Sequence, residues 1–348
     1  MNSTFFNSSD GEQVEYDGQE VSAIAVTTVY AVMGLLGVLG NTLVLFVIIV
    51  VRDLHDVANV FIGNQSLIDL LTSLLLLASF VAPLPSIPTK DPILARFLCA
   101  FWHSKYPFWS LIVASSLNLT LMTLERYYAI VFPLHYHSRT KSTKLICLVA
   151  LPWLSGFAYQ QYLAWFSKVE QNQCHLFLFP NIASRTGLTF GATFLELFLP
   201  TIVIIYVYIA VYIKLKITMT EKFKDSGKST GSRVPSSDTS VPNTNSRIRA
   251  RRNVLKMMLI VSACFVICWL PNLIIYWLYI FGVNIDLTGL IYTLSVFIAF
   301  GNMWINPFIY SFQYRRFQKG LRQVFCRCKR GKEAKRSKTT PSTISLAV

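Results

Sequence analysis

The sequence predicts an all-α membrane protein in which seven transmembrane helices form a bundle and a short amphipathic eighth helix follows them. Three observations predict this fold: the composition, the length of the apolar stretches and the distribution of basic residues. Of the 348 residues, 53% are hydrophobic and 14% are charged. Soluble domains carry about 25% charged residues. The composition therefore argues against an ordinary soluble enzyme and for a chain that is surrounded by lipid.

Seven apolar stretches are long enough to cross a bilayer as helices. A helix needs about 20 mostly apolar residues to span roughly 30 Å of hydrocarbon. Transmembrane β-strands would be about half as long and would alternate in polarity, so these stretches predict helices. The predicted spans are 23–51, 60–82, 97–132, 145–166, 188–215, 254–281 and 287–312.

The basic residues are concentrated in a few connecting segments. Ten of the 32 Lys and Arg residues lie in 214–252 and eleven in 315–338, whereas residues 1–21 hold five acids and no base. Lys and Arg are retained on the cytoplasmic side of a membrane, so we expect an extracellular N-terminus and a cytoplasmic C-terminus in the plasma membrane. The net charge of +15 does not indicate a nucleic-acid partner, because no basic stripe is interleaved with stacking aromatics.

These features divide the chain into an extracellular segment, a transmembrane domain with one long cytoplasmic loop, an amphipathic helix and a tail. Asn2 and Asn7 begin glycosylation sequons in the extracellular segment. Within the long loop, 221–246 is rich in Ser, Thr, Gly, Pro and Asn and is predicted to be disordered, as is the tail. The extracellular segment is 1–22, the transmembrane domain is 23–312 and its cytoplasmic loop is 216–252. The amphipathic helix is 313–328 and the tail is 329–348.

Short polar and proline-containing motifs occur inside the predicted spans. Glu125-Arg126-Tyr127 ends the third span near the interface, where a charged pair costs less than at the bilayer centre. The other motifs are Asn41, Asp69, Phe265 to Pro271 with Cys268-Trp269-Leu270-Pro271, and Asn306-Pro307-Phe308-Ile309-Tyr310. In this order they resemble the rhodopsin-like (class A) G-protein-coupled receptors, and the resemblance extends over residues 26–328. Further family positions are matched by Trp153, Pro200, Tyr208 and Pro133-Leu134.

Three prolines interrupt the predicted helices of the fifth, sixth and seventh spans. Pro200, Pro271 and Pro307 each remove a backbone hydrogen bond and kink their helix, which makes a hinge about which a helix can swing. Trp269 lies two residues before Pro271 and is expected to report the occupancy of a ligand cavity to that hinge. The resemblance implies a switch that couples to a heterotrimeric G protein and contains Glu125, Arg126, Tyr127, Leu134, Tyr208, Phe265, Trp269, Pro271, Asn306, Pro307 and Tyr310.

The inner end of the sixth span lacks an acid that many relatives use to hold the third-span Arg in the resting state. That end reads Arg249-Ala250-Arg251-Arg252. We therefore expect Glu125 alone to restrain Arg126, and we expect measurable signalling in the absence of a ligand.

Asp69 lies deep in the second span, where a carboxylate requires a hydrogen-bonding partner, a proton or a cation. The resemblance implies a sodium site formed by Asp69, Ser115 and Asn306. Met303 and Leu111 depart from the polar residues that are usual at their positions, so a neutral, hydrogen-bonded Asp69 is the alternative. No other cofactor is expected.

Four cysteines carry predictions. The resemblance implies a disulfide between Cys99 and Cys174, both on the predicted extracellular side. Cys99 lies 27 residues before Arg126, a longer interval than is usual in the family, so we expect an altered turn there. Cys326 and Cys328 end an amphipathic stretch and are predicted to be palmitoylated, which would bind the helix to membrane lipid; unmodified thiols are the alternative.

The sequence defines the ligand less well than the fold. No Lys occurs in 287–312, which argues against a retinal Schiff base, and Phe108 stands where amine receptors carry an Asp. A peptide is the favoured ligand, because nothing selective for a small molecule is evident. The predicted ligand-binding residues are Lys105, Phe108, Trp109, Glu196, Trp269, Asn272, Tyr276 and Tyr292.

Glu196 is an acid at membrane depth that needs a partner, which a cation on the ligand, Lys105 or a proton could provide. A receptor for an amine or other small molecule that uses Glu196 is the alternative to a peptide receptor. A transporter or channel is a weaker alternative, since only Asp69 and Glu196 are deep acids. An enzyme is not expected, because no nucleophile, base and orienting group converge. Ser and Thr residues in 337–345 are candidate sites for receptor kinases and for arrestin recruitment.

Overall fold

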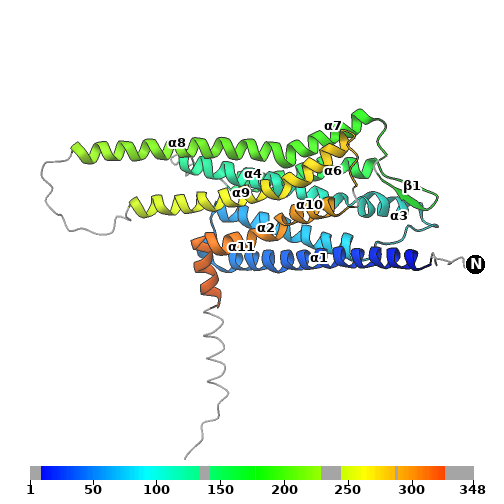
Figure 1. Cartoon of the computed structure of the whole chain (residues 1–348). Coiled ribbons are helices and arrows are strands. Elements are labelled where there is room, and N and C mark those ends of the chain that lie inside the picture. The colour runs from blue at the N-terminus through cyan, green and yellow to red at the C-terminus, as the bar shows by residue number, and fades with distance from the viewer. Residues whose placement is uncertain are drawn as a thin grey trace, which may run out of the picture.

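A computed structural model describes residues 9–132, 136, 142–176, 178–228, 244–286 and 289–325. These residues form long helices that lie side by side with roughly parallel axes (Figure 1). A single β-hairpin marks one end of this bundle in the described part of the chain, on the right of Figure 1. We call it the hairpin end, and we call the opposite end, where the helix that carries Arg126 finishes, the Arg126 end.

Each predicted span coincides with a helix or a run of consecutive helices. The long helices are α1 (Ser9–Val50), α2 (Val57–Leu76), α4 (Tyr106–Val131), α6 (Ser142–Trp165), α8 (Leu199–Lys228), α9 (Thr244–Ile280), α10 (Leu290–Phe300) and α11 (Asn302–Gln313). Shorter helical segments are η1 (Arg52–Leu54), η2 (Leu77–Val81), α3 (Pro92–Phe97), η3 (Leu98–His103), α7 (Ile182–Thr193) and η4 (Phe194–Phe198). Residues 315–325 form the predicted amphipathic helix, which turns away from the bundle (Figure 1).

Length and composition support membrane insertion of these helices. The described residues hold five helical segments that could cross a membrane, or six when α10 and α11, bent by 43° against each other, count as one span. α6, with 24 residues, occupies the position of the predicted fourth span. It is not among the five or six counted above, and it carries polar residues such as Ser155, Gln160 and Gln161.

The helix ends differ most from the predicted boundaries in two places. α1 begins at Ser9, inside the predicted extracellular segment, well before the predicted span. α8 continues to Lys228 and α9 begins at Thr244, so both ends of the segment 221–246 that was predicted to be disordered are helical. Lys, Glu and Met are good helix formers, and they allow these helices to continue beyond the apolar stretches. Residues 229–243 lie outside the described residues.

Large apolar side chains fill the interior of the bundle and also cover its outside. Phe61, Phe265 and Phe317 are buried in one extended apolar core. Leu39 and Ile267 are 65–68% exposed on outward faces of the helices. Such exposed apolar surface is expected where the surrounding solvent is lipid.

α4 lies at the centre of the arrangement and packs against α2, α6 and α8. Gly156 allows α6 to approach α4 closely, because a Cβ atom at this position would collide with the carbonyl oxygen of Ser110. This close approach brings polar side chains of α2, α4 and α6 within hydrogen-bonding distance of one another.

The hairpin is tied to η3, the segment before α4, by the predicted disulfide, Cys99–Cys174, which is confirmed. β1 (Lys168–Glu170) pairs with β2 (Gln173–His175) in antiparallel register, with Val169 opposite Cys174. The chain between Cys99 and α4 departs from regular α-helix at two points. η3 is a π-helical segment, and Lys105 follows it with a left-handed backbone conformation, φ 55° and ψ 27°, before α4 begins.

Candidate functional site

Asp69 is the centre of a buried polar cluster between α2, α4 and α11. Its Oδ1 atom accepts hydrogen bonds from Gln65 Nε2 at 3.0 Å and Ser115 Oγ at 3.1 Å. Its Oδ2 atom accepts one from Asn306 Nδ2 at 2.8 Å. The structure thus brings together the three residues of the predicted sodium site and adds Gln65. Sequence reasoning missed Gln65, although it lies four residues before Asp69, on the same helix face.

The side chains around Asp69 do not fit a sodium ion. Sodium requires oxygen ligands, but an amide nitrogen, Gln65 Nε2, lies 2.5 Å from Ser115 Oγ and 3.0 Å from Asp69 Oδ1. Met303 and Leu111, each 2% exposed, add apolar groups to the surroundings. The arrangement favours the alternative of a carboxyl group held by hydrogen bonds.

A backbone carbonyl that Pro307 leaves free inside α11 is satisfied from α1. Pro307 has no N–H group, so the carbonyl oxygen of Met303, four residues earlier, has no partner within the helix. Asn41 Nδ2 donates to this oxygen at 2.8 Å and also to Gly37 O at 2.9 Å. The predicted hinge in the seventh span therefore has a side chain from another helix that satisfies its free backbone group.

The predicted switch residues of α9 lie in the core of the bundle. Phe265 and Trp269 are 1% and 2% exposed, and their ring centroids are 6.4 Å apart. Pro271 lies inside α9, one half-turn beyond Trp269. Asn272 Nδ2 donates to Ser295 Oγ at 3.2 Å and connects α9 with α10. A movement of α9 about Pro271 would therefore change the contact between Phe265 and Trp269 on one side of the proline and the bond from Asn272 to Ser295 on the other.

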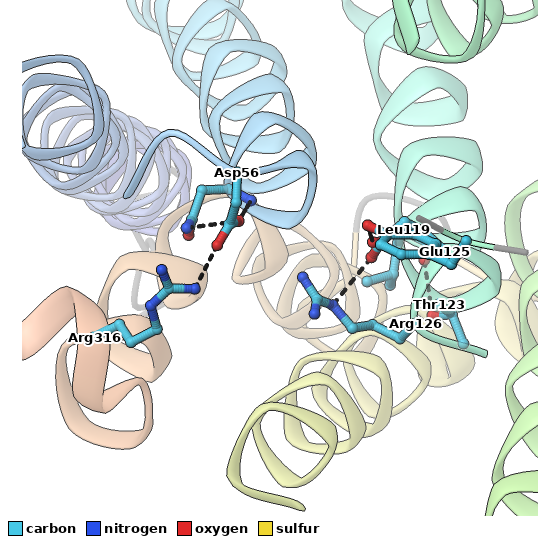
Figure 2. Close-up of polar contacts among 8 residues, drawn as sticks. Asp56, Leu119, Thr123, Glu125, Arg126 and Arg316 are labelled. Atoms are coloured by element: carbon cyan, nitrogen blue, oxygen red, sulfur yellow. Dashed lines mark hydrogen bonds and ion pairs between the residues drawn. The ribbon is translucent and has the colours of Figure 1, made fainter. Parts of the chain in front are cut away.

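The Arg126 end carries two ion pairs. Arg126 Nε lies 3.0 Å from Glu125 Oε2, although the geometry is not that of a hydrogen bond. Arg316 Nη1, in the amphipathic helix, pairs with Asp56 at the start of α2. Figure 2 shows both pairs, with the Arg126 side chain extending from α4 in the direction of the Asp56–Arg316 pair. Sequence reasoning had identified the first pair only.

Glu125 has a second partner that sequence reasoning did not identify. Tyr136 Oη donates a hydrogen bond to Glu125 Oε1 at 2.5 Å. Burial and the neighbouring Glu125 carboxylate raise the pKa of the Tyr136 phenol, so the phenol keeps its proton for this hydrogen bond. The prediction that Glu125 alone restrains Arg126 therefore needs correction: Tyr136 helps to hold Glu125.

The predicted tyrosines of the switch are placed differently from one another. Tyr310 is fully buried, as expected. Tyr208 is 49% exposed on α8 and faces away from the bundle, so the structure does not bring it to Tyr310 and Arg126. Tyr127 instead meets Tyr206 of α8, with ring centroids 5.9 Å apart.

At the hairpin end, Lys105 and Phe108 belong to an aromatic cluster. Lys105 Nζ lies 3.5 Å from the centroid of the Phe80 ring. The ring centroid of Phe108 is 5.2 Å from those of Phe80 and Phe300 and 5.3 Å from that of Trp109. Phe108 is fully buried. It therefore acts as a packing residue in this structure, in contrast to the predicted ligand contact.

Glu196 lies in η4 and is 6% exposed. Its carboxylate accepts a hydrogen bond from Gln160 Nε2 of α6 at 3.2 Å, and its backbone oxygen accepts one from Ser116 Oγ at 2.8 Å. Lys105, placed over Phe80, is not its partner. The structure thus excludes Lys105, one of the three partners considered for Glu196. It shows a further partner, Gln160, which sequence reasoning missed.

The remaining predicted ligand residues, Tyr276 and Tyr292, are half-buried at the hairpin end of α9 and α10. A separate hollow of about 500 Å³ opens between α3 and β1 at the same end. Pro92, Arg96 and Lys168 are among its lining residues, and none of the predicted ligand residues lines it.

Comparison with known proteins identifies the family. Residues 40–310 match the profile described as 7 transmembrane receptor (rhodopsin family). The chain belongs to this family. It is 26% identical to galanin receptor 2a of Danio rerio, over 88% of this chain and 79% of that protein. It is 28% identical to somatostatin receptor type 3 of Homo sapiens, over 89% of this chain and 70% of that protein. It is also 28% identical to cholecystokinin receptor type A of Cavia porcellus, over 86% of this chain and 80% of that protein.

Family membership confirms several predictions. The chain is a multi-pass membrane receptor that acts in signalling and is not an enzyme. Five predicted sites cannot be placed, because they lie outside the described residues: Asn2, Asn7, Leu134, Cys326 and Cys328.

Proposed function

We propose that this receptor binds an extracellular peptide at the hairpin end and activates a heterotrimeric G protein at the Arg126 end. The observation that carries the proposal is the set of similar proteins, which are receptors named for galanin, somatostatin and cholecystokinin. The distribution of Lys and Arg supports the orientation, with the hairpin end outside the cell and the Arg126 end in the cytoplasm.

The hinges provide the mechanism. A ligand that binds more tightly when the Arg126 end is open shifts an existing equilibrium toward that state. Trp269, buried beside Phe265, lies half a turn before Pro271, on the side of the Arg126 end, and transmits ligand occupancy to the hinge of α9. Once Arg126 leaves Glu125, the opened end accepts a helix of the G-protein α-subunit, in the helix-in-groove mode of recognition. Leu134 contributes an apolar contact from the following loop.

Further partners act on the C-terminal part of the chain. Residues 315–325 form the amphipathic helix that would lie on the membrane surface, held by palmitoylation of Cys326 and Cys328. Receptor kinases and arrestin would act on the Ser and Thr residues of 337–345.

A second candidate ligand is an amine or other small molecule that binds Glu196. Among the described residues, the carboxylate of Glu196 accepts a hydrogen bond only from Gln160. A buried carboxylate with one neutral donor has capacity for a cationic group of a ligand.

A ligand screen tests the proposal. Cells that express the receptor are exposed to a library of peptides and a library of amines, and second messengers are recorded. We expect activation by a peptide, and loss of that response in an Arg126→Ala variant that reaches the cell surface equally well. Activation by amines alone would favour the second candidate.

Epitope tags test the orientation independently. An N-terminal tag should be accessible on intact cells and a C-terminal tag only after permeabilisation. Accessibility of both tags on intact cells would contradict the proposal.

A further inference from the structure

A chain of hydrogen-bonded side chains crosses the bundle from α6 to Asp69. Trp153 Nε1 donates to Asn64 Oδ1 at 3.0 Å, and Asn64 Nδ2 donates to Asn118 Oδ1 at 2.8 Å. Asn118 Nδ2 then donates to Gln65 Oε1 at 2.8 Å, and Gln65 Nε2 donates to Asp69 Oδ1 at 3.0 Å. The three amide side chains are at most 6% exposed, so solvent cannot replace these bonds.

The direction of every bond in this chain follows from Trp153. An indole N–H can donate but cannot accept, so the atom of Asn64 that faces it must be the oxygen. The Asn64 amide group must then point toward Asn118, and Asn118 must in turn present its oxygen to Asn64 and its amide group to Gln65. The nitrogen of the Gln65 side chain is therefore forced to face Asp69. This logic assigns the orientation of three amides whose oxygen and nitrogen atoms have nearly the same shape.

The two hydrogens of Gln65 Nε2 are both used at the end of this chain. One bond goes to Asp69 Oδ1 and the other to Ser115 Oγ, which is 2.5 Å away. Ser115 Oγ itself donates to Asp69 Oδ1 at 3.1 Å. The oxygen atoms that a cation would need from Asp69 and Ser115 thus already accept hydrogen bonds from the protein.

We propose that the Gln65 amide takes the place of a sodium ion beside Asp69, and that this receptor is insensitive to sodium. A cation could enter only by displacing Gln65 Nε2 from both oxygens. The displaced amide would lose its acceptors in a buried environment, and Asn118 Nδ2 would lose its bond to Gln65 Oε1, which leaves only its bond to Phe61 O at 3.2 Å. The indole of Trp153 opposes such a rearrangement from the other end of the chain of bonds.

The first test measures thermal unfolding of the purified full-length receptor in sodium chloride and in choline chloride at equal ionic strength. We expect the same midpoint in both salts for the wild type. In a Gln65→Leu variant the oxygens of Asp69 and Ser115 are released, and we expect sodium to raise the midpoint by about 2 °C. The double variant Gln65→Leu with Asp69→Asn is the control and should lose this response. Neither the peptide nor the G protein is needed, so the result is independent of the proposed function.

Two results would overturn the proposal. One is stabilisation of the wild type by sodium over choline that disappears in Asp69→Asn. The other is a folded Gln65→Leu variant that does not respond to sodium, because the amide would then not be the group that excludes the ion. If Gln65→Leu does not fold, sodium-23 NMR of the wild type and of Asp69→Asn decides: equal line widths support the proposal, and excess broadening by the wild type rejects it.

Discussion

Tyr136 Oη lies 2.5 Å from Glu125 Oε1, while the second oxygen of the same carboxylate lies 3.0 Å from Arg126 Nε. Glu125 is therefore held from both sides, by a phenol from the segment that follows α4 and by the neighbouring guanidinium. The side chain of Glu125 is 7% exposed, so water contributes little to this arrangement. In a receptor without an acid at the Arg249 end of α9, the tyrosine takes a share of the restraint on Arg126.

A Tyr136→Phe variant tests this restraint. The change removes one hydrogen bond to a charged group, which contributes about 1.5–3 kcal/mol, and leaves the ring in place. Because Glu125 then holds Arg126 less firmly, we expect ligand-free nucleotide exchange on the G protein to rise by up to about tenfold.

Tyr128→Phe is the matched control for Tyr136→Phe. Tyr128 is 56% exposed at the same end of α4, and its loss should leave basal exchange unchanged. An equal increase in both variants would refute a specific role for Tyr136. Absence of any ligand-free exchange in the wild type, relative to membranes without the receptor, would contradict the expected basal activity.

The spans and the disulfide could be predicted because their signals lie in the sequence itself or in the family motifs. The apolar stretches coincide with α1, α2, α4, α6 and the later helices. The contacts that define the sites were harder to predict from the sequence. Gln65, Tyr136 and Gln160 are single polar residues, and their partners Ser115, Glu125 and Glu196 lie 50, 11 and 36 positions away in the sequence. Only the contact of Gln65 with Asp69, four residues later, is local.

Two predicted roles also depended on side-chain directions that sequence position alone cannot provide. Phe108 was expected in a ligand cavity, but it is packed between Phe80 and Phe300. Tyr208 was expected to take part in the switch, and in this structure it is 49% exposed on α8. The direction of a side chain depends on where the helix begins and on local π-helical segments such as η4, which precedes α8. One additional residue in a helical turn rotates every following side chain by about 100°.

Asp56 both caps α2 and forms an ion pair at the Arg126 end. Asp56 Oδ1 accepts a hydrogen bond from Asn59 N at 3.0 Å and caps α2, and its other oxygen pairs with Arg316. Loss of such a cap costs about 1 kcal/mol, and an exposed ion pair contributes about 0.2–1 kcal/mol. Asp56→Asn keeps the cap and loses the charge, whereas Asp56→Ala loses both. We expect thermal midpoints to fall in the order wild type, Asp56→Asn, Asp56→Ala. A larger loss in Arg316→Ala than in Asp56→Ala would contradict this division.

Gln160 and Glu196 form the buried pair at the interface of α6 and η4. Replacing Gln160 by Leu leaves the Glu196 carboxylate without its hydrogen-bond donor, which should cost about 1–3 kcal/mol of stability. Gln161 follows directly in the sequence and is exposed, so Gln161→Leu is the matched control and should be nearly neutral. Equal midpoints for the two variants in thermal unfolding would contradict the assigned role of Gln160.

The same pair predicts ligand selectivity. If Glu196 receives a cationic group, Glu196→Gln should lower the potency of agonists with an amine or guanidinium by about tenfold or more, which corresponds to about 1.4 kcal/mol. Neutral agonists should keep their potency. Dose–response curves of second messengers in cells with equal surface expression provide the measurement. Unchanged potency for every agonist would exclude the cation role.

Lys105 combines an unfavourable backbone conformation with a favourable side-chain contact. Its left-handed backbone, φ 55°, costs about 1–2 kcal/mol for a residue with a Cβ atom, while its ammonium group over Phe80 contributes about 0.5–2 kcal/mol. Lys105→Ala removes the contact and keeps the strain. Lys105→Gly removes both, so we expect the glycine variant to unfold at a higher temperature than the alanine variant.

Lys168 provides a control with the opposite expectation. It is exposed in the extended strand β1, where glycine is less favourable than alanine by about 0.5–1 kcal/mol. The order of the two midpoints should therefore reverse between the positions. If Lys105→Ala were as stable as Lys105→Gly, the left-handed turn would not limit stability. Lys105 would then adopt its left-handed conformation without measurable cost.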